Sequence, residues 1–365
     1  MAGLYVLGAR QRKLLLKNEE EWNLYESALI LHLDPQTGRV RTCVEYKSPS
    51  AARANDNSSV VFKSGTLIGN TLYACTSTEV LIFKLPQFER IAYISLPCFN
   101  DVHHVTPSRD GNLLAANTGL DMVIKFNRAG EVLAEWCVLE EQPWSRFSRA
   151  VDYRKVESTK PHQSHPNFVF HLGDEIWVTR CRQRDAICLN EPGKRIEIAF
   201  QFPHDGLVCG DRIYFTTVDG RVAIVNRNTL QVSAIIDLKE MSDPNSMLGW
   251  CRGLWPVDDR KIWVGFTRVR KTKIRENVLW VRSIFREGMT EAPTHIALYD
   301  IAEGRCLQEF DLEAHGMNIV FGVFPPTGSN SWTPELPGPA NERAVLRNED
   351  VKTRVFKTRN VERQG

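Results

Sequence analysis

The amino-acid sequence predicts an all-β protein, a six-bladed β-propeller whose blades are four-stranded antiparallel sheets. A strand-onset pattern recurs five times, at intervals of roughly forty residues, and a Gly, Asp or Asn turn precedes the next apolar run. Each copy begins with a basic or imidazole side chain, and these five heads are Lys63, His104, His165, His204 and Arg252. Self-similarity at this interval is typical of a radial repeat rather than of a layered domain.

Each onset is followed by further alternating segments, which gives four strands per unit. The clearest unit spans residues 204–238, where β-branched runs are separated by turns that contain Asp, Asn and Gly. Turns of this composition between such runs are hairpin signals. The same template predicts units at about 60–96, 102–137, 164–200, 203–238 and 250–312.

A sixth blade requires both ends of the chain. Residues 4–7, 28–33 and 39–46 resemble the second, third and fourth strands of a blade that lacks its first. Residues 318–324 can supply that innermost strand, which would make Asn318 the sixth head. A blade shared in this way between the termini closes the ring and removes exposed sheet edges.

Three stretches fall outside the blades. Residues 138–163 form a polar and aromatic connection before the third blade, and residues 268–293 interrupt the fifth. Within the second insertion a short amphipathic helix is indicated by the spacing of Ile274, Val278, Val281 and Phe285. Long insertions that contain aromatic residues favour lids. Residues 327–365 are rich in proline and basic residues and predict an extended tail, so the propeller is expected to occupy residues 1–326.

The composition indicates a soluble globular protein. The 365 residues are 42% hydrophobic and 25% charged, and the net charge of +2 gives no general attraction to nucleic acid or to an anionic membrane. No stretch approaches the ~20 apolar residues that a membrane helix needs. The nine cysteines contain no CxxC pair, which favours buried thiols in a reducing compartment. With no signal peptide evident at the start, we expect a cytoplasmic protein.

The first strand of every blade in a propeller lines the central channel, so the heads should converge on one axis. Three imidazoles on consecutive blades, from His104, His165 and His204, could ligate one divalent ion and leave positions open for water or substrate. Zinc, iron(II) and manganese(II) all suit such a site. Lys63 and Arg252 would then face an anionic group of a small substrate.

Several assignments stay open at this stage. His103 is the alternative to His104, because neighbours along a strand face opposite ways. Asp205 could orient His204 as a carboxylate partner or could simply form a tight turn. His162 is expected to be a solvent-exposed or lid residue. Tyr153 on the connection, with Arg146 and Arg149, could supply an acid, a base or an anion clamp, or could lie on a solvated loop face.

The blade texture, with Asp110-Gly-Asn-Leu-Leu114 and Gly210-Asp-Arg-Ile-Tyr214 at strand onsets, resembles the six-bladed propellers of the NHL, SMP-30/gluconolactonase and strictosidine-synthase-like group. The resemblance covers about residues 3–325. The axial histidines with Arg252 nearby are similar to the zinc centre of peptidylglycine amidating lyases, which combine histidines from separate blades with an arginine and a tyrosine. Lys63 departs from the gluconolactonase pattern, where a metal-binding acid is expected.

These observations predict a metal-dependent enzyme that acts on a small oxygenated or carboxylated substrate in the central channel. A lyase or a hydrolase is favoured over an oxygenase, because nothing in the sequence indicates an oxygen-handling pocket. Walker, dinucleotide, GxSxG and HExxH motifs are absent from the sequence. The alternative is a non-catalytic propeller that binds a protein or a small ligand on its top face.

Overall fold

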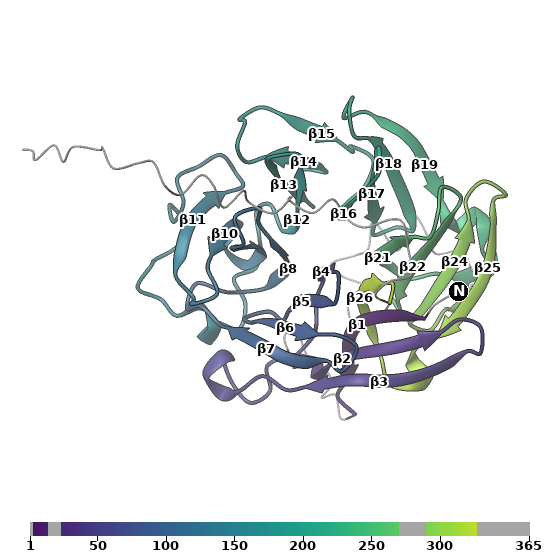
Figure 1. Cartoon of the computed structure of the whole chain (residues 1–365), viewed down its shortest axis with the longest axis horizontal. Helices are drawn as coiled ribbons and strands as arrows, with labels where there is room; N and C mark the ends of the chain where they lie inside the picture. Colours follow the sequence, from purple (N-terminus) through teal and green to yellow (C-terminus); the bar gives the residue numbers. More distant parts are fainter. Residues whose placement is uncertain (1–2, 14–22, 270–289, 327–365) are drawn as a thin grey trace, which may run out of the picture.

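The computed structural model describes residues 3–13, 23–269 and 290–326. These residues form six sheets of four antiparallel strands, arranged as blades around a central axis (Figure 1). The predicted fold class is therefore confirmed. The predicted amphipathic helix and the C-terminal tail lie outside the described residues.

Blades 1 to 3 follow the chain in order, each from its inner to its outer strand. Blade 1 contains β4 (Gly65–Ile68), β5 (Thr71–Cys75), β6 (Val80–Lys84) and β7 (Glu89–Ile94). Blade 2 contains β8 (Val102–Pro107), β9 (Leu113–Asn117), β10 (Met122–Phe126) and β11 (Val132–Cys137). Blade 3 contains β12 (Pro166–Leu172), β13 (Glu175–Arg180), β14 (Asp185–Cys188) and β15 (Arg195–Glu197).

Blades 4 to 6 complete the ring. Blade 4 contains β16 (Pro203–Cys209), β17 (Arg212–Thr217), β18 (Arg221–Asn226) and β19 (Val232–Asp237). Blade 5 contains β21 (Trp250–Pro256), β22 (Lys261–Thr267), β24 (His295–Asp300) and β25 (Arg305–Asp311). Beside blade 5, β20 (Ser246–Met247) pairs in parallel with β23 (Thr290–Glu291). Blade 6 contains β26 (Ile319–Phe324), β1 (Leu4–Gln11), β2 (Tyr25–Asp34) and β3 (Arg39–Tyr46).

Blade 6 joins the two ends of the described chain. The inner strand β26 pairs antiparallel with β1, and Tyr5 lies opposite Phe324. The one-plus-three closure predicted from the sequence is thus present, and β1 is not left as an edge strand.

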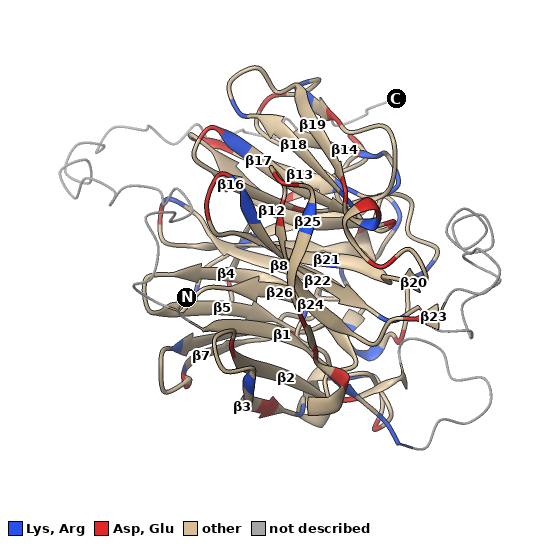
Figure 2. Cartoon of the chain, turned by 90° about the vertical axis from the view of Figure 1, so that its right-hand side faces the viewer, with Lys and Arg blue, Asp and Glu red and all other residues tan. Residues whose placement is uncertain are grey.

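The hydrophobic core lies between neighbouring blades. One cluster, which includes Tyr73, Ile82, Val105 and Leu113, fills the space between blades 1 and 2. Another packs Trp263 of blade 5 against the termini in blade 6. Charged residues are spread over loops and strand ends in the side view (Figure 2). Among the described residues no helix has the length and apolar character needed to cross a membrane.

Most inner strands are irregular close to their beginnings. The pairing register shifts near the start of β8, β12, β16 and β21, for example between Val102 and His104 in β8. A bulge adds a residue to one strand and therefore interrupts the strict alternation of side chains. The side chains that reach the channel at these points cannot be assigned by counting along the strand.

Candidate functional site

The beginnings of the inner strands surround a cavity of about 810 Å³ at one mouth of the central channel. Parts of residues 52–61, between blades 6 and 1, and of residues 154–162, before blade 3, complete its wall. Four of the five sequence-predicted heads line the cavity, namely Lys63, His165, His204 and Arg252. The structure brings these four side chains together although they come from four blades.

His104 lies outside this cavity and lines a second, smaller pocket farther along the inner strands, where its side chain is buried. Its Nε2–H donates to the carbonyl oxygen of Gly65 (3.0 Å), and its Nδ1 accepts from the N–H of Val169 (3.3 Å). Its ring stacks on Phe168 at 3.6 Å between centroids. Burial lowers the pKa of His104 to about 3. The placement corrects the prediction of His104 as a metal ligand, because both ring nitrogens already serve to join blade 2 to blades 1 and 3.

His103, the alternative to His104, faces the cavity instead. Its Nδ1 lies 2.7 Å from the carbonyl oxygen of Asp101 and 3.3 Å from Nζ of Lys63. The closer carbonyl favours a hydrogen on Nδ1, which leaves the lone pair on Nε2. Burial and the charge of Lys63 lower the pKa of His103 to about 3, so the ring is neutral.

Asp101 lies two residues before His103 and accepts a hydrogen bond from the Lys63 ammonium through Oδ1. Burial opposes ionisation of this carboxyl, but Lys63, His103 and His162 outweigh it and hold the pKa of Asp101 below its usual value. The other oxygen, Oδ2, lies 4.0 Å from Nδ1 of His162. Asp101 is therefore an ionised carboxylate with one oxygen directed at an imidazole.

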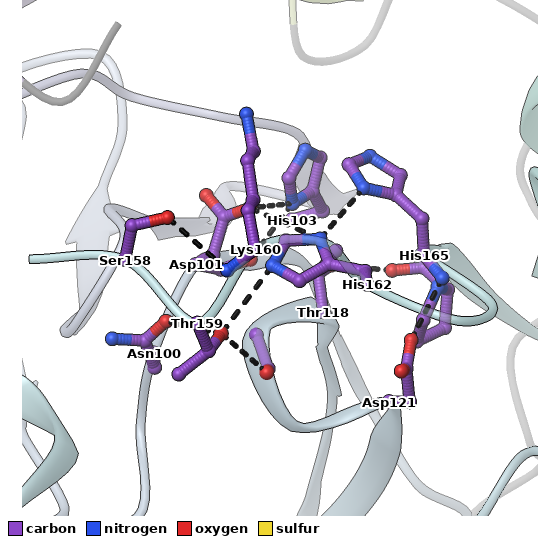
Figure 3. Close-up of polar contacts among 12 residues, drawn as sticks. Asn100, Asp101, His103, Thr118, Asp121, Ser158, Thr159, Lys160, His162 and His165 are labelled. Atoms are coloured by element: carbon purple, nitrogen blue, oxygen red, sulfur yellow. Dashed lines mark hydrogen bonds and ion pairs between the residues drawn. The ribbon is translucent and has the colours of Figure 1, made fainter. Parts of the chain in front are cut away.

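His162 and His165 lie side by side at the end of the connection before blade 3 (Figure 3). Their Nδ1 atoms are 3.0 Å apart. Together with Asp101 they form a group whose potential metal-ligand atoms all lie within 4.8 Å of one another. His162 is buried, which corrects the expectation that it is exposed to solvent.

The hydrogen bonds around His162 fix the roles of its ring nitrogens. Its Nε2 lies 3.3 Å from Thr159 Oγ1, and that hydroxyl donates to the carbonyl oxygen of Gly119 (2.5 Å). Thr159 therefore accepts from Nε2–H, and Nδ1 of His162 carries a lone pair. Two lone pairs that face each other at 3.0 Å repel, so either a proton on His165 Nδ1 or a bound cation must lie between the rings.

Both rings are neutral. Burial is the main reason that the pKa of His162 is lowered, although Asp101 opposes it. For His165 burial again comes first, and the neighbouring imidazoles His103 and His162 add to it, so its pKa lies well below the ordinary value. Neutral imidazole is the form that binds metal ions.

Asp121 holds the backbone that carries these histidines. Its carboxylate accepts hydrogen bonds from three successive backbone N–H groups, at Gln163 (2.9 Å), Ser164 (3.0 Å) and His165 (2.8 Å), and pairs with Arg146. His165 itself has a φ of +60°, a conformation that L residues rarely adopt. Three charge-assisted bonds at one carboxylate offset the cost of that backbone geometry.

His204, in blade 4, and Arg252, in blade 5, also line the cavity. His204 is buried and makes no hydrogen bond among the described residues, so its ring is open to the cavity. Burial and the charge of Arg252 lower its pKa well below the usual value. The guanidinium of Arg252 lies over the rings of Phe321 (4.7 Å) and Trp250 (5.4 Å) and has no carboxylate partner in the described part of the chain.

Blade 6 contributes Phe321 to the cavity rather than Asn318. Phe321 also lies 5.8 Å from Nζ of Lys63 and contacts the ring of His103 edge-on. Asn318 instead accepts from the backbone N–H of Gln11 (2.9 Å), where it supports the pairing of β26 with β1. Blade 6 therefore contributes to the cavity an aromatic ring that lies near two cations, Lys63 and Arg252.

Asp205 is a bridge between blades and does not orient His204. It has a φ of +61°, and its carboxylate accepts from the Thr216 hydroxyl and from the N–H of Gly253 (3.1 Å). Burial raises the pKa of Asp205 to about 6, although these hydrogen bonds and Arg252 act against the rise. The sequence left open whether Asp205 orients His204 or forms a tight turn. The structure shows a role in the backbone, because Asp205 has a positive φ and binds the N–H of Gly253.

Tyr153 lies in the core beneath the connection and away from the cavity. Its side chain is 6% exposed, and its hydroxyl accepts from the N–H of Ser148 (2.9 Å). Trp144 and Phe147 pack around its ring. Tyr153 does not line the cavity, which corrects the prediction that it is a catalytic residue. Its aromatic packing instead anchors the connection, whose residues 154–162 form part of the cavity wall.

Comparisons with known proteins identify the architecture. No family model matches the chain, and no curated protein matches its sequence. A protein of unknown function from Bacteroides caccae is 12% identical with a TM-score of 0.57, over 89% of this chain and 99% of that one. A chain of a nidogen/laminin complex is 9% identical with a TM-score of 0.50, over 88% and 97%.

A streptogramin B lyase is more distant, at 12% identity and a TM-score of 0.44 over 85% of this chain and 88% of that one. At such identities the likeness shows the fold alone. The chain is a six-bladed propeller. The chemistry of its cavity has to be argued from its own residues.

The sequence analysis missed Asp101 and His162 as members of the central group. Two short clusters could have revealed them, since Asp101 directly precedes the predicted strand that contains His103 and His104, and His162 lies three residues before His165. Both clusters put ligand-type side chains beside a predicted head. The repeat pattern alone does not point to Asp101 or His162, because neither residue is the head of a repeat.

Proposed function

We propose that this propeller is a metal-dependent enzyme, of lyase or hydrolase type, that acts on a small carboxylated substrate in the cavity. The observation that carries the proposal is the group of Asp101, His162 and His165, whose ligand atoms lie within 4.8 Å of one another beside an open cavity. Asp101 and His165 come from segments on either side of blade 2, far apart in the sequence. Such convergence of two neutral imidazoles and one carboxylate is typical of mononuclear metal sites.

The spacing of the two imidazoles fits a divalent ion. Two ligands at about 2.1 Å from one ion lie about 3 Å apart when they subtend a right angle, and the Nδ1 atoms of His162 and His165 are 3.0 Å apart. The hydrogen bond from His162 to Thr159 is of the kind that orients a ligating histidine from its other nitrogen. Zinc, iron(II) and manganese(II) all accept this donor set.

A bound divalent ion would supply Lewis acidity or activate a water molecule. The chain's own residues would do the rest. Arg252 would bind a substrate carboxylate, with its guanidinium held over the ring of Phe321. Once an anion neutralises Arg252, one cause of the low pKa of His204 is removed, and His204 becomes a better proton acceptor. Lys63 keeps Asp101 ionised.

Metal content tests the proposal directly. The full chain, purified without added metal and then dialysed against zinc, iron(II) or manganese(II), should hold about one ion per chain by mass spectrometry. Asp101→Asn, His162→Gln and His165→Gln should each lose most of it, whereas His104→Gln and His32→Gln should keep it. A chain that stays metal-free after supplementation would favour the alternative, a non-catalytic propeller that binds a ligand on this face.

A further inference from the structure

The cavity is larger than a metal ion and one carboxylate require. Its volume of about 810 Å³ lies in the range of roughly 300–1,000 Å³ that holds drug-sized ligands. Seven of the lining residues are Lys or Arg and only two are Asp or Glu, which favours an anion. The two sides of the cavity carry different side chains, so the ligand should have two chemically different parts.

One side is aromatic and carries Arg252, a cation that has no carboxylate partner among the residues that the structure describes. Trp250 and Arg252 come from blade 5, Phe321 comes from blade 6, and Phe202 lies just before blade 4 with 37% of its surface exposed. Phe321 and Trp250 hold the Arg252 guanidinium, which leaves its charge available to the cavity. A planar apolar group that bears a carboxylate matches this side, with its ring against the aromatic faces and its acid at Arg252.

The other side carries charged side chains, among them Arg53, Asp101 and Lys160, and also the short hydroxyl side chains of Ser58, Ser77 and Ser158. The Oγ atoms of Ser58 and Ser158 accept hydrogen bonds from the backbone N–H groups of Asn55 and Lys160. Their hydroxyl hydrogens therefore remain able to donate into the cavity. A surface of small hydroxyl groups is complementary to a polyhydroxylated group and offers little to an apolar one.

The two sides oppose each other because of the order of the blades. The hydroxyl side is built from blades 1 and 2 and from the connections beside them, and the aromatic side from blades 4, 5 and 6. In a six-membered ring, blade 1 lies across the axis from blade 4, and blade 2 from blade 5 (Figure 1). His103, His165 and His204, from blades 2, 3 and 4, line the cavity where the two sides meet, and Phe321 of the aromatic side contacts the ring of His103.

We infer that the ligand of this cavity is a two-part anion, an aromatic carboxylate joined to a polyhydroxylated group, of which a carboxylated aryl glycoside is the simplest form. The inference rests on the proposed function in one respect, since it names the substrate class of that enzyme. The binding itself depends on Arg252, the aromatic side chains and the hydroxyl side, and does not require the metal.

Calorimetric titration of the full chain with three probes tests this. The probes are 4-carboxyphenyl β-glucoside, phenyl β-glucoside, which lacks the acid, and benzoate, which lacks the sugar. The two-part probe should bind at least about tenfold more tightly than either of the others, a difference of about 1.4 kcal/mol. Arg252→Gln should remove this advantage and leave phenyl β-glucoside binding unchanged. Ser77→Leu should weaken both glucosides and leave benzoate unchanged.

Arg90→Gln is the matched control, because Arg90 also lies over an aromatic ring, that of Tyr93 at 5.7 Å, but on the outer strand β7. It should change no affinity. Two results would overturn the inference. One is that 4-carboxyphenyl β-glucoside binds no more tightly than the tighter-binding of the other two probes. The other is that Arg252→Gln leaves its affinity unchanged. Each titration is made on chelator-treated and on zinc-loaded protein. A chain that binds the two-part probe but no metal supports the inference and contradicts the proposed function. A chain that binds metal but not the probe supports the proposed metal site and contradicts the inference.

Discussion

Asp121 acts on the cavity without lining it. It belongs to blade 2, yet its three backbone hydrogen bonds fix the segment that presents His162 and His165. Asp121 directly follows the turn of residues 118–120, and an aspartate in a turn commonly caps backbone amides nearby. The carboxylate does cap amides, but they lie more than forty positions further along the chain. Local composition predicts the kind of bond that Asp121 makes and not its partner.

Asp121→Asn should loosen the metal site without unfolding the ring. An amide has one acceptor oxygen in place of two, so part of the support of residues 163–165 is lost and His165 gains freedom. We expect metal affinity to fall by about 10- to 100-fold, as for other residues that orient ligands, with little change in the unfolding midpoint. Asp219→Asn is the control, since Asp219 accepts from Thr217 and Arg221 on blade 4. Equal metal affinities in the two variants would contradict the role of Asp121.

Asp205 should make the stability of the ring depend on pH. Its folded pKa of about 6 exceeds the ordinary value of 3.8, so the folded state holds this proton more tightly than the unfolded state. The stabilisation is fully present below about pH 4 and is lost as pH rises through about 6, by up to about 3 kcal/mol. In Asp205→Asn the difference between urea unfolding at pH 4 and at pH 7 should shrink accordingly. An identical pH dependence in the variant would exclude this assignment.

At the scale of elements, the bulges near the starts of the inner strands decide which residue reaches the cavity. In β8 the register shifts between Val102 and His104, and His103 lines the cavity whereas His104 lines the smaller pocket farther along the inner strands. Strand β26 shows a similar effect, because Ile319 and Phe321 line the cavity and the predicted head Asn318 does not. A count of positions from the repeat predicts the strands but not these two outcomes.

Strand β26 completes both the ring and the cavity, and truncation can separate it from the tail. A chain that ends at residue 326 should keep the unfolding midpoint and metal content of the full chain, because every described contact of blade 6 is retained. A chain that ends at residue 317 loses the inner strand of blade 6 and the side chain of Phe321. It should be strongly destabilised or insoluble, as judged by circular dichroism and gel filtration. Normal folding of the shorter chain would contradict the closure.

At the scale of the whole molecule, the proposed ion would cross-link two segments of the ring. Asp101 begins blade 2, and His162 and His165 lie on the connection that leads into blade 3, so one ion would tie two parts of the ring together. Ligands that bind only the folded state raise its stability. The ring is also held by apolar contacts between neighbouring blades and by hydrogen bonds such as those of His104 and Asp205.

Chelation should therefore lower the melting temperature of the zinc-loaded chain, by about 5 °C if the ion is bound at a hundred times its dissociation constant. The same treatment should not affect Asp101→Asn, which already lacks a ligand. Differential scanning calorimetry with and without chelator measures the shift. A shift of equal size in both proteins would mean that the chelator acts elsewhere.

The sequence by itself determined the architecture, because strand alternation, turn composition and a repeated onset are local properties that each segment carries alone. The six blades, the shared closing blade and the meeting of Lys63, His165, His204 and Arg252 follow from them. Only the tertiary structure decided that His103 replaces His104, that His162 and Asp101 join His165, and that Tyr153 is core. Those outcomes depend on bulges and on hydrogen bonds between distant segments, such as the one from Val169 to His104, and a side chain's direction there is set by partners that no local pattern specifies.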